Sequence, residues 1–387
     1  MRFAERMKYL SSAIFSQLAE KKIELEKKGK EIINLSVGSP DMAPAPHIIK
    51  ALQDACADTG NYAYALKDTP ELLLAVKEWY KRRFDVELDE QNEVMSLLGS
   101  QDGLAHIALT LVDPGDIVLV PDPGYPIFSV GPLIAGAELV KMPLKKENGF
   151  LVDFDSIDKN AAKKAKLMIV SYPGNPVTAM ATEEFYKELI DFAKKYDIVV
   201  LHDNAYCELT FDGLKTGSFL SYPGAKDVGV EFNSLSKTYN MAGCRIGFAL
   251  GNREVIKQLS TIKSHMDYGL FLPLQKAAVA ALTGPQDQVK RNAETYQRRR
   301  DILVDGLKKL GWEIDKPKAT MFVWAPIPEK FSSSTDFTMS LMEKAGVMVV
   351  PGISFGELGE GYVRIALVQP EEKIQEAVDR IADSGLI

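Results

Sequence analysis

A lysine and an arginine, each set among small polar residues, form the most informative stretch of this chain. Lys237 lies close to the hydroxyl residues Ser234 and Ser236, and Arg245 follows among glycines. Apolar, strand-like segments flank the whole stretch 233–248. A solvated surface lysine is the common alternative, but surface loops rarely carry this density of Ser, Thr and Gly between two apolar runs. An amine can condense with an aldehyde, and hydroxyl and guanidinium groups can hold a phosphate. The stretch therefore indicates a site for a phosphorylated, carbonyl-bearing cofactor.

Two further charged residues follow or interrupt apolar strands. Asp203 comes just after the apolar run Ile198–Leu201, and a desolvated carboxylate there needs a cationic partner such as a protonated ring nitrogen. An N-cap or turn role is the alternative for Asp203. Arg364 interrupts the apolar strand Tyr362–Leu367, where a carboxylate is the natural bidentate anion. An internal salt bridge is the alternative for Arg364.

Three loops at strand ends display polar or aromatic groups. Asn175 lies between a glycine and a proline, which hold its amide in place. Tyr125 lies in a loop made rigid by two prolines, where a ring can stack on a flat heterocycle or simply pack under the loop. Ser100 and Gln101 belong to a glycine-containing turn before a helix predicted from Gly103, and the free N–H groups of such a turn suit an anion.

Composition narrows the class of protein. The chain has 387 residues and a net charge of −7, which argues against nucleic acid as a partner. No apolar run is long enough to span a bilayer, and the first residues lack the pattern of a signal peptide. The three cysteines are far apart, which favours reduced thiols in the cytoplasm. The four histidines lack metal-ligand spacing, so His106 and His202 are predicted to have core or supporting roles, and no metal is expected.

The stretch 233–248 closely resembles the Ser-x-Ser-Lys signature, with its following Arg-x-Gly, of the pyridoxal-phosphate (PLP) dependent aminotransferases of fold type I, class I/II. The resemblance covers essentially the whole chain. It implies that Lys237 links covalently to the cofactor aldehyde and moves the substrate α-proton. It also implies that Arg245, Ser234 and Ser236 bind the cofactor.

The same resemblance assigns roles to residues on other loops. It implies that Asp203 pairs with the pyridine nitrogen, that Tyr206 bonds the phenolic oxygen and that Tyr125 covers the face of the ring. The phosphate is expected at the backbone N–H groups of Ser100 and Gln101.

The substrate α-carboxylate also has implied partners. Arg364 matches the family's C-terminal arginine, which grips this carboxylate. Asn175 is expected to bond both the carboxylate and the phenolic oxygen of the cofactor, and Gly38 is a candidate backbone contact beside it.

A tyrosine in the loop before Pro70 is implied to reach the other subunit's cofactor phosphate in a homodimer. Tyr64 is our choice for this contact and Tyr62 is the rival. Asp68 and Leu73 depart from the residues common in the family at this loop, so the loop is expected to differ in shape.

Strands alternate with helices from Val94 to Ala280, which predicts an α/β fold with a mostly parallel sheet. The resemblance implies a seven-stranded large domain and a smaller α/β C-terminal domain. We expect residues 1–45 to contribute to the small domain, residues 46–284 to form the large PLP-binding domain and residues 285–387 to form the small one. A single strand is predicted over Val347–Val350.

The predicted function is ping-pong transamination between an L-amino acid and a 2-oxo acid. The resemblance is strongest to the LL-diaminopimelate, alanine and aspartate types, so acidic, small neutral and diamino substrates all stay open. A PLP-dependent lyase or decarboxylase could use the same residues. A nicotinamide-dependent dehydrogenase is disfavoured because no Gly-x-Gly-x-x-Gly follows the early strands, and the acidic chain leaves no room for a DNA-binding domain before Ile32.

Overall fold

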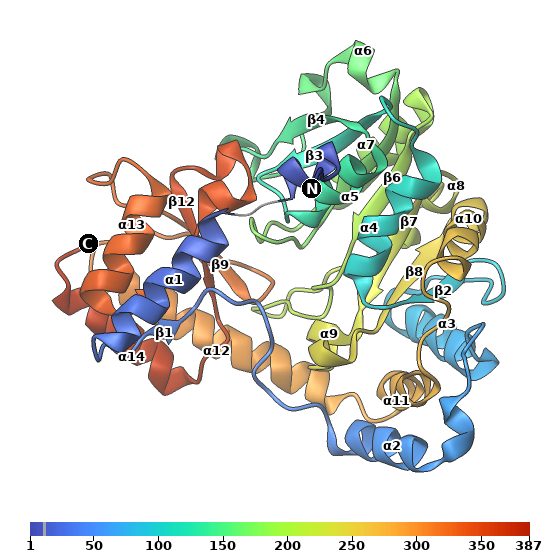
Figure 1. Ribbon diagram of the computed structural model, residues 1–387, viewed down its shortest axis with the longest axis horizontal. Coiled ribbons are helices and arrows are strands. Elements are labelled where there is room, and N and C mark those ends of the chain that lie inside the picture. The colour runs from blue at the N-terminus through green and yellow to red at the C-terminus, as the bar shows by residue number, and fades with distance from the viewer. Residues whose placement is uncertain (11–12) are drawn as a thin grey trace.

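A computed structural model describes residues 1–10 and 13–387. A seven-stranded sheet forms its centre, in the order β2-β8-β7-β6-β5-β3-β4 (Figure 1). Its strands are β2 (Val94–Leu97), β3 (Ile117–Asp122), β4 (Glu138–Pro143), β5 (Ala165–Val170), β6 (Val199–Asp203), β7 (Gly229–Ser234) and β8 (Gly247–Gly251). The β3–β4, β3–β5, β5–β6 and β6–β7 pairs are parallel, whereas β8 runs antiparallel to β2 and β7. The predicted α/β fold with a mostly parallel sheet is confirmed.

The central strands are apolar on both faces because helices cover both. In β3, Val118 and Val120 belong to a hydrophobic cluster shared with α4 and α5, while Leu119 between them belongs to a second cluster shared with α3 and α7. Successive side chains of a strand point to opposite faces, so a continuous apolar run is what a doubly covered strand requires. The helices of this part are α2 (Pro46–Ala57), α3 (Pro70–Phe84), α4 (Ser100–Leu111), α5 (Ile127–Ala135), α6 (Lys159–Ala162), α7 (Glu183–Tyr196), α8 (Ala225–Val228), α9 (Leu235–Thr238), α10 (Arg253–Ser264) and α11 (Leu272–Thr283).

A second group of elements combines the two ends of the chain. Strand β1 (Ile33–Asn34) pairs in parallel with β10 (Val347–Met348), and β12 (Tyr362–Ala366) lies between β9 (Phe322–Pro326) and β11 (Val350–Pro351) in an antiparallel sheet. Its helices are α1 (Ala13–Lys27), α12 (Asp287–Lys309), α13 (Ser334–Ser340), continued by a π-helical turn over Leu341–Ala345, and α14 (Glu371–Asp383). Figure 1 shows the blue N-terminal helix against the red C-terminal elements. This arrangement agrees with an N-terminal contribution to the smaller part, while the domain bounds at 45/46 and 284/285 stay a prediction.

Some elements differ from those predicted. The run Val347–Val350 is divided between two sheets: β10 pairs with β1, and β11 pairs with β12. Helix α4 begins at Ser100 rather than Gly103, because Gly99 takes the N-cap position with a φ of 79°. The half-exposed edge strand β4 was not predicted. Among the described residues, none of the helices is both long and apolar enough to cross a membrane.

Candidate active site

A cavity of about 560 Å³ opens at the ends of the central strands and reaches β12. The residues singled out from the sequence line it, with Tyr64 as the exception. They are Gly38, Ser100, Gln101, Tyr125, Asn175, Asp203, Tyr206, Ser234, Ser236, Lys237, Arg245 and Arg364. The loops that follow β3, β5, β6 and β7 supply many of them, at the edge where parallel α/β sheets bind their ligands. The fold thus brings together residues that are far apart in the chain.

Lys237 lies on the single-turn helix α9, directly after β7. The Ser234 hydroxyl caps this turn by accepting a hydrogen bond from the Ser236 N–H at 3.1 Å. Lys237 Nζ donates to the Gly38 carbonyl at 2.7 Å. Burial lowers the pKa of the amine to about 8, and the charges of Arg245 and Arg364 act in the same direction. A larger fraction of this amine is therefore neutral and nucleophilic near neutral pH than for an exposed lysine.

Asp203 ends β6 with only 6% of its surface exposed. Burial raises the pKa of its carboxyl to about 6, although the charge of His202 and the Ala205 N–H oppose the shift. The Oδ1 atom is buried and has no hydrogen-bond partner among residues 1–10 and 13–387. A buried carboxylate oxygen without a donor is uncommon and suits a cation bound in the cavity.

Arg364 projects from β12 between two aromatic rings. Its guanidinium carbon lies 4.3 Å from the centroid of Phe322 and 4.8 Å from that of Phe355. It donates to Asn175 Oδ1 at 2.8 Å and to the Ser36 carbonyl at 2.7 Å. Burial lowers its pKa to about 10, so the group remains charged at neutral pH. Within the described part of the chain its partners are an amide and a backbone carbonyl and not an acidic side chain, which argues against the internal salt-bridge interpretation.

The N-terminal turn of α4 faces Arg245 across a narrow gap. Arg245 has a left-handed φ of 53°. A Cβ on Gly99 would lie 2.4 Å from Arg245 Nη2, and one on Gly247 would lie 2.6 Å from the Ser100 nitrogen. The two glycines therefore permit the close approach of the helix N-terminus and the guanidinium. Free N–H groups, the helix dipole and a fixed cation form a donor set that fits a phosphate.

Two tyrosines complete the walls of the cavity. The Tyr125 hydroxyl donates to Gln101 Oε1 at 3.1 Å. The Tyr206 ring packs edge-on against Phe322, with 5.7 Å between the centroids. Burial raises the pKa of both hydroxyls, so both stay protonated and can donate a hydrogen bond.

Tyr64 lies outside this cavity. Its side chain is 83% exposed and packs against the ring of Tyr268, 5.7 Å away. The hydroxyl of Tyr62 is used within its own subunit, where it donates to the Cys56 carbonyl at 3.0 Å. Asp68, which differs from the residue common in the family at this position, has a structural role. Its carboxylate accepts the backbone N–H of Ser96 in β2 at 2.7 Å.

Several wall residues were missed from the sequence. Phe322 and Phe355 enclose Arg364, and Ser36 supplies a carbonyl to it. An aromatic residue next to an apolar strand usually packs in a core, so neither phenylalanine carries a signal of its own. The pairing of β9 with β12, seen only in the fold, places Phe322 beside the arginine strand.

Comparisons with known proteins agree with this geometry. Residues 30–381 match the family model described as aminotransferase class I and II. The chain is 47% identical over 385 residues to an LL-diaminopimelate aminotransferase of Moorella thermoacetica, with 98% of each chain covered. It is 45% identical over 387 residues to the protein of that name from Halothermothrix orenii, with 100% of this chain and 99% of the relative covered.

Solved structures are similar over the whole length. Substrate-bound BacF from Bacillus subtilis superimposes with a TM-score of 0.96 at 40% identity, covering 100% of this chain and 98% of that one. A probable N-succinyldiaminopimelate aminotransferase from Thermus thermophilus gives a TM-score of 0.92 at 35% identity, and the match covers 96% of this chain and 100% of that one.

The chain therefore belongs to the class I and II aminotransferases, a family that in general depends on pyridoxal phosphate. It is an aminotransferase, which moves an amino group between an amino acid and a 2-oxo acid in amino-acid metabolism. The family, the fold class and the enzyme class predicted from the sequence are confirmed.

Proposed function

We propose that this aminotransferase binds pyridoxal phosphate in the cavity described above, with Lys237 as the residue that links to its aldehyde. One observation carries the proposal: a lysine amine with its pKa lowered to about 8 shares the cavity with the unpartnered carboxylate of Asp203. The amine suits an aldehyde, and the carboxylate suits a protonated ring nitrogen. The residues present therefore fit the cofactor.

Each end of the cofactor has candidate partners. The first N–H groups of α4, at Ser100 and Gln101, would hold the phosphate together with Arg245, Ser234 and Ser236. Tyr125 would cover the ring, while Asn175 and Tyr206 would donate to its phenolic oxygen. When bound, pyridoxal phosphate supplies an electron sink for the negative charge that develops at the substrate α-carbon.

Arg364 and Lys237 have different roles toward the substrate: Arg364 binds it and Lys237 transfers its proton. The Arg364 guanidinium and the Asn175 amide bind the α-carboxylate, with Gly38 beside them, and this fixes the direction of the α-C–H bond. Lys237 Nζ would then take up the α-proton as a general base and, as a general acid, deliver it to the cofactor carbon bonded to the transferred nitrogen. Because donor and acceptor both carry an α-carboxylate, one cavity serves them in turn, as a ping-pong sequence requires.

LL-diaminopimelate is the amino donor that we propose to test first. Relatives bearing that name are 43–47% identical to nearly the whole chain. The apolar side chains of Val37, Ile127 and Val130 line the cavity and suit the methylene groups of such a substrate. Acidic and small neutral amino acids are the competing donors, with 2-oxoglutarate and pyruvate as acceptors.

We further propose that the enzyme is a cytoplasmic homodimer in which Tyr64 reaches the partner's phosphate site. The hydroxyl of Tyr62 is already used within its own subunit, whereas Tyr64 is the more exposed of the two. Three free cysteines agree with a reducing compartment.

Lys237→Ala tests the cofactor proposal. We expect the wild-type protein to absorb in the visible range with pyridoxal phosphate and borohydride to fix the cofactor on Lys237. We expect the variant to lose at least about 10³-fold in turnover, because it removes both the linking and the proton-transferring amine. Lys257→Ala, at an exposed position, is the control and should keep wild-type turnover. Near-normal turnover of Lys237→Ala would refute the assignment, and a product mixture without a new amino acid would favour a lyase or decarboxylase.

A further inference from the structure

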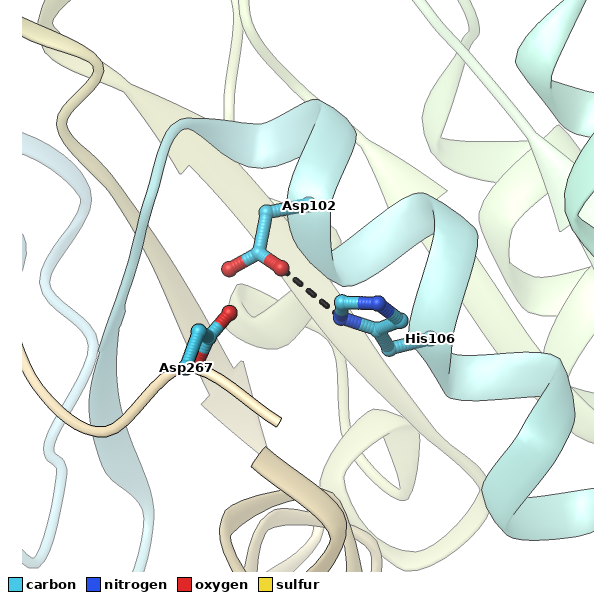
Figure 2. Close-up of side chains that lie close together, drawn as sticks. All are labelled: Asp102, His106 and Asp267. Atoms are coloured by element: carbon cyan, nitrogen blue, oxygen red, sulfur yellow. Dashed lines mark ion pairs between the residues drawn. The ribbon is translucent and has the colours of Figure 1, made fainter. Parts of the chain in front are cut away.

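A cluster of acidic and basic side chains lies behind the N-terminal turn of α4 (Figure 2). Asp102 and His106 project from α4 toward Asp267, which follows α10, and His106 Nδ1 lies 2.8 Å from Asp102 Oδ1. One ligand atom of each lies within 4.8 Å of the others, a spacing that a metal ion could use. Lys263 already supplies the cation: its ammonium donates to Asp102 Oδ2 and, at 2.7 Å, to Asp267 Oδ2. The cluster is therefore an ion-pair network and not a vacant metal site.

Lys263 is buried to an extent that is rare for a lysine. Its side chain is 5% exposed, and those of Asp102 and Asp267 are 8% and 20% exposed. A buried ammonium without its carboxylates, or a buried carboxylate without its ammonium, is strongly unfavourable. The network thus fixes α10 and the loop after it against α4.

The carboxylate of Asp102 also shapes the turn that faces the cavity. Its Oδ2 accepts the backbone N–H of Leu98 at 2.9 Å, and Asp102 is the third residue of α4, next to Ser100 and Gln101. A negative charge in the first helical turn is attracted by the same dipole that attracts a phosphate, and it repels a phosphate bound there. The ammonium of Lys263 offsets that charge while Asp102 still holds the turn.

We propose that Lys263 is a positioning residue for the phosphate-binding turn of α4, and this rests on the proposed function. It neutralises Asp102, so that the carboxylate can brace the backbone at Leu98 without opposing the phosphate. It also holds Asp267, which precedes Tyr268, the residue that packs against Tyr64. One ammonium therefore supports both the phosphate turn and the loop beneath the proposed cross-subunit tyrosine.

Titration of the cofactor-free protein with pyridoxal phosphate and with pyridoxal separates the phosphate contribution from the rest. We expect Lys263→Met to bind pyridoxal phosphate about tenfold more weakly and pyridoxal with unchanged affinity, because only the phosphate is repelled by an Asp102 carboxylate that has lost the Lys263 ammonium and keeps His106 as a neighbour at 2.8 Å. The affinity of the same variant for inorganic phosphate, titrated alone, should fall by a similar factor. Lys257→Met, on an exposed face of the same helix, is the control and should bind both compounds as the wild type does.

Asp102→Asn is the second variant of this experiment. It removes the negative charge, while its amide oxygen can still accept the Leu98 N–H. The double variant Asp102→Asn with Lys263→Met should regain phosphate-dependent affinity to within about threefold of wild type, because the first turn of α4 then carries no negative charge. The carboxylate of Asp267, which follows α10 and is 20% exposed, is present in both Lys263→Met proteins and so does not distinguish them. Equal weakening for pyridoxal and pyridoxal phosphate, no weakening in Lys263→Met, or a tenfold loss in Asp102→Asn alone would overturn the proposal. A wild type that binds phosphate but no pyridoxal phosphate would refute the cofactor assignment instead.

Discussion

Burial of a single amine at position 237 should reduce the stability of the cofactor-free protein. The pKa of Lys237 falls from 10.5 to about 8 in the folded state, so the folded protein binds fewer protons than the unfolded chain between these values. The contribution of this residue to stability is therefore favourable above pH 10.5 and is lost as the pH falls through 8. Under the proposed function, this would be the energetic cost of keeping the amine ready for an aldehyde.

Lys237→Met should for this reason stabilise the cofactor-free protein at pH 7 by about 2 kcal/mol, after a discount for the solvent that still reaches the partly buried amine. The difference should shrink between pH 8 and pH 10, as the wild-type amine becomes neutral in the fold. Urea unfolding of both proteins at pH 7 and pH 9.5 measures this difference in the free energy of unfolding, with Lys257→Met as the control for an exposed lysine. A variant that is less stable at pH 7, or a difference that is independent of pH, would contradict the prediction.

At the residue scale, the sequence predicted the polar members of the cavity better than its apolar ones. Asp203 ends β6 and Lys237 lies on the turn after β7. A charged group at the end of an apolar run is costly to bury unless a partner or ligand balances it, so it is a strong sign of a site. Phe322 and Phe355 look like any core phenylalanine. The pairing of β9 with β12 puts Phe322 beside Arg364, and the short helical turn Gly352–Phe355 brings Phe355 to its other side.

Among the elements, the shape of the proposed phosphate-binding turn depends on how closely α4 approaches the strand β8. Gly247→Ala would place a Cβ 2.6 Å from the Ser100 nitrogen, which forces the turn away from Arg245. We expect about a tenfold to hundredfold loss of affinity for pyridoxal phosphate, since such overpacking costs roughly 1–3 kcal/mol. Equilibrium titration followed by absorbance measures the loss. Gly243→Ala is the matched control in the same segment, because a Cβ there meets no atom within 4 Å. Equal effects of the two substitutions would contradict the role of close approach.

Elements were predictable where the local pattern determines them. The local pattern determines the start of helix α7 (Glu183–Tyr196), since the Thr182 side chain caps it by accepting the N–H of Phe185. The run Val347–Val350 was wrongly predicted as one strand, because an apolar run does not show that its two halves pair with different partners. Strand β4 was missed because it lies at the sheet edge, where its pattern is mixed.

For the whole molecule, one surface has the character of a subunit interface. Two segments, 62–66 and 268–271, meet there through the ring pairs Tyr62–Phe271 and Tyr64–Tyr268. Several of their large side chains are exposed, with Tyr64 at 83% and Leu66 at 67%. Exposed apolar patches of this kind commonly mark protein contacts. Since the sequence does not reveal which residues of one chain face the other, the dimer and its contacts remain proposals.

Subunit mixing tests the proposed dimer and the reach of Tyr64 together. Lys237→Ala and Tyr64→Ala should each be strongly impaired alone. In a mixed dimer, the site that keeps Lys237 would receive an intact Tyr64 from its partner, while the other site would lack both. Equal mixing makes half of the dimers mixed, each with one complete site, so roughly a quarter of wild-type turnover should return. If Tyr64 served its own subunit, no site would be complete and mixing would restore nothing. Tyr62→Ala should stay active before mixing, because the hydroxyl of Tyr62 bonds within its own chain.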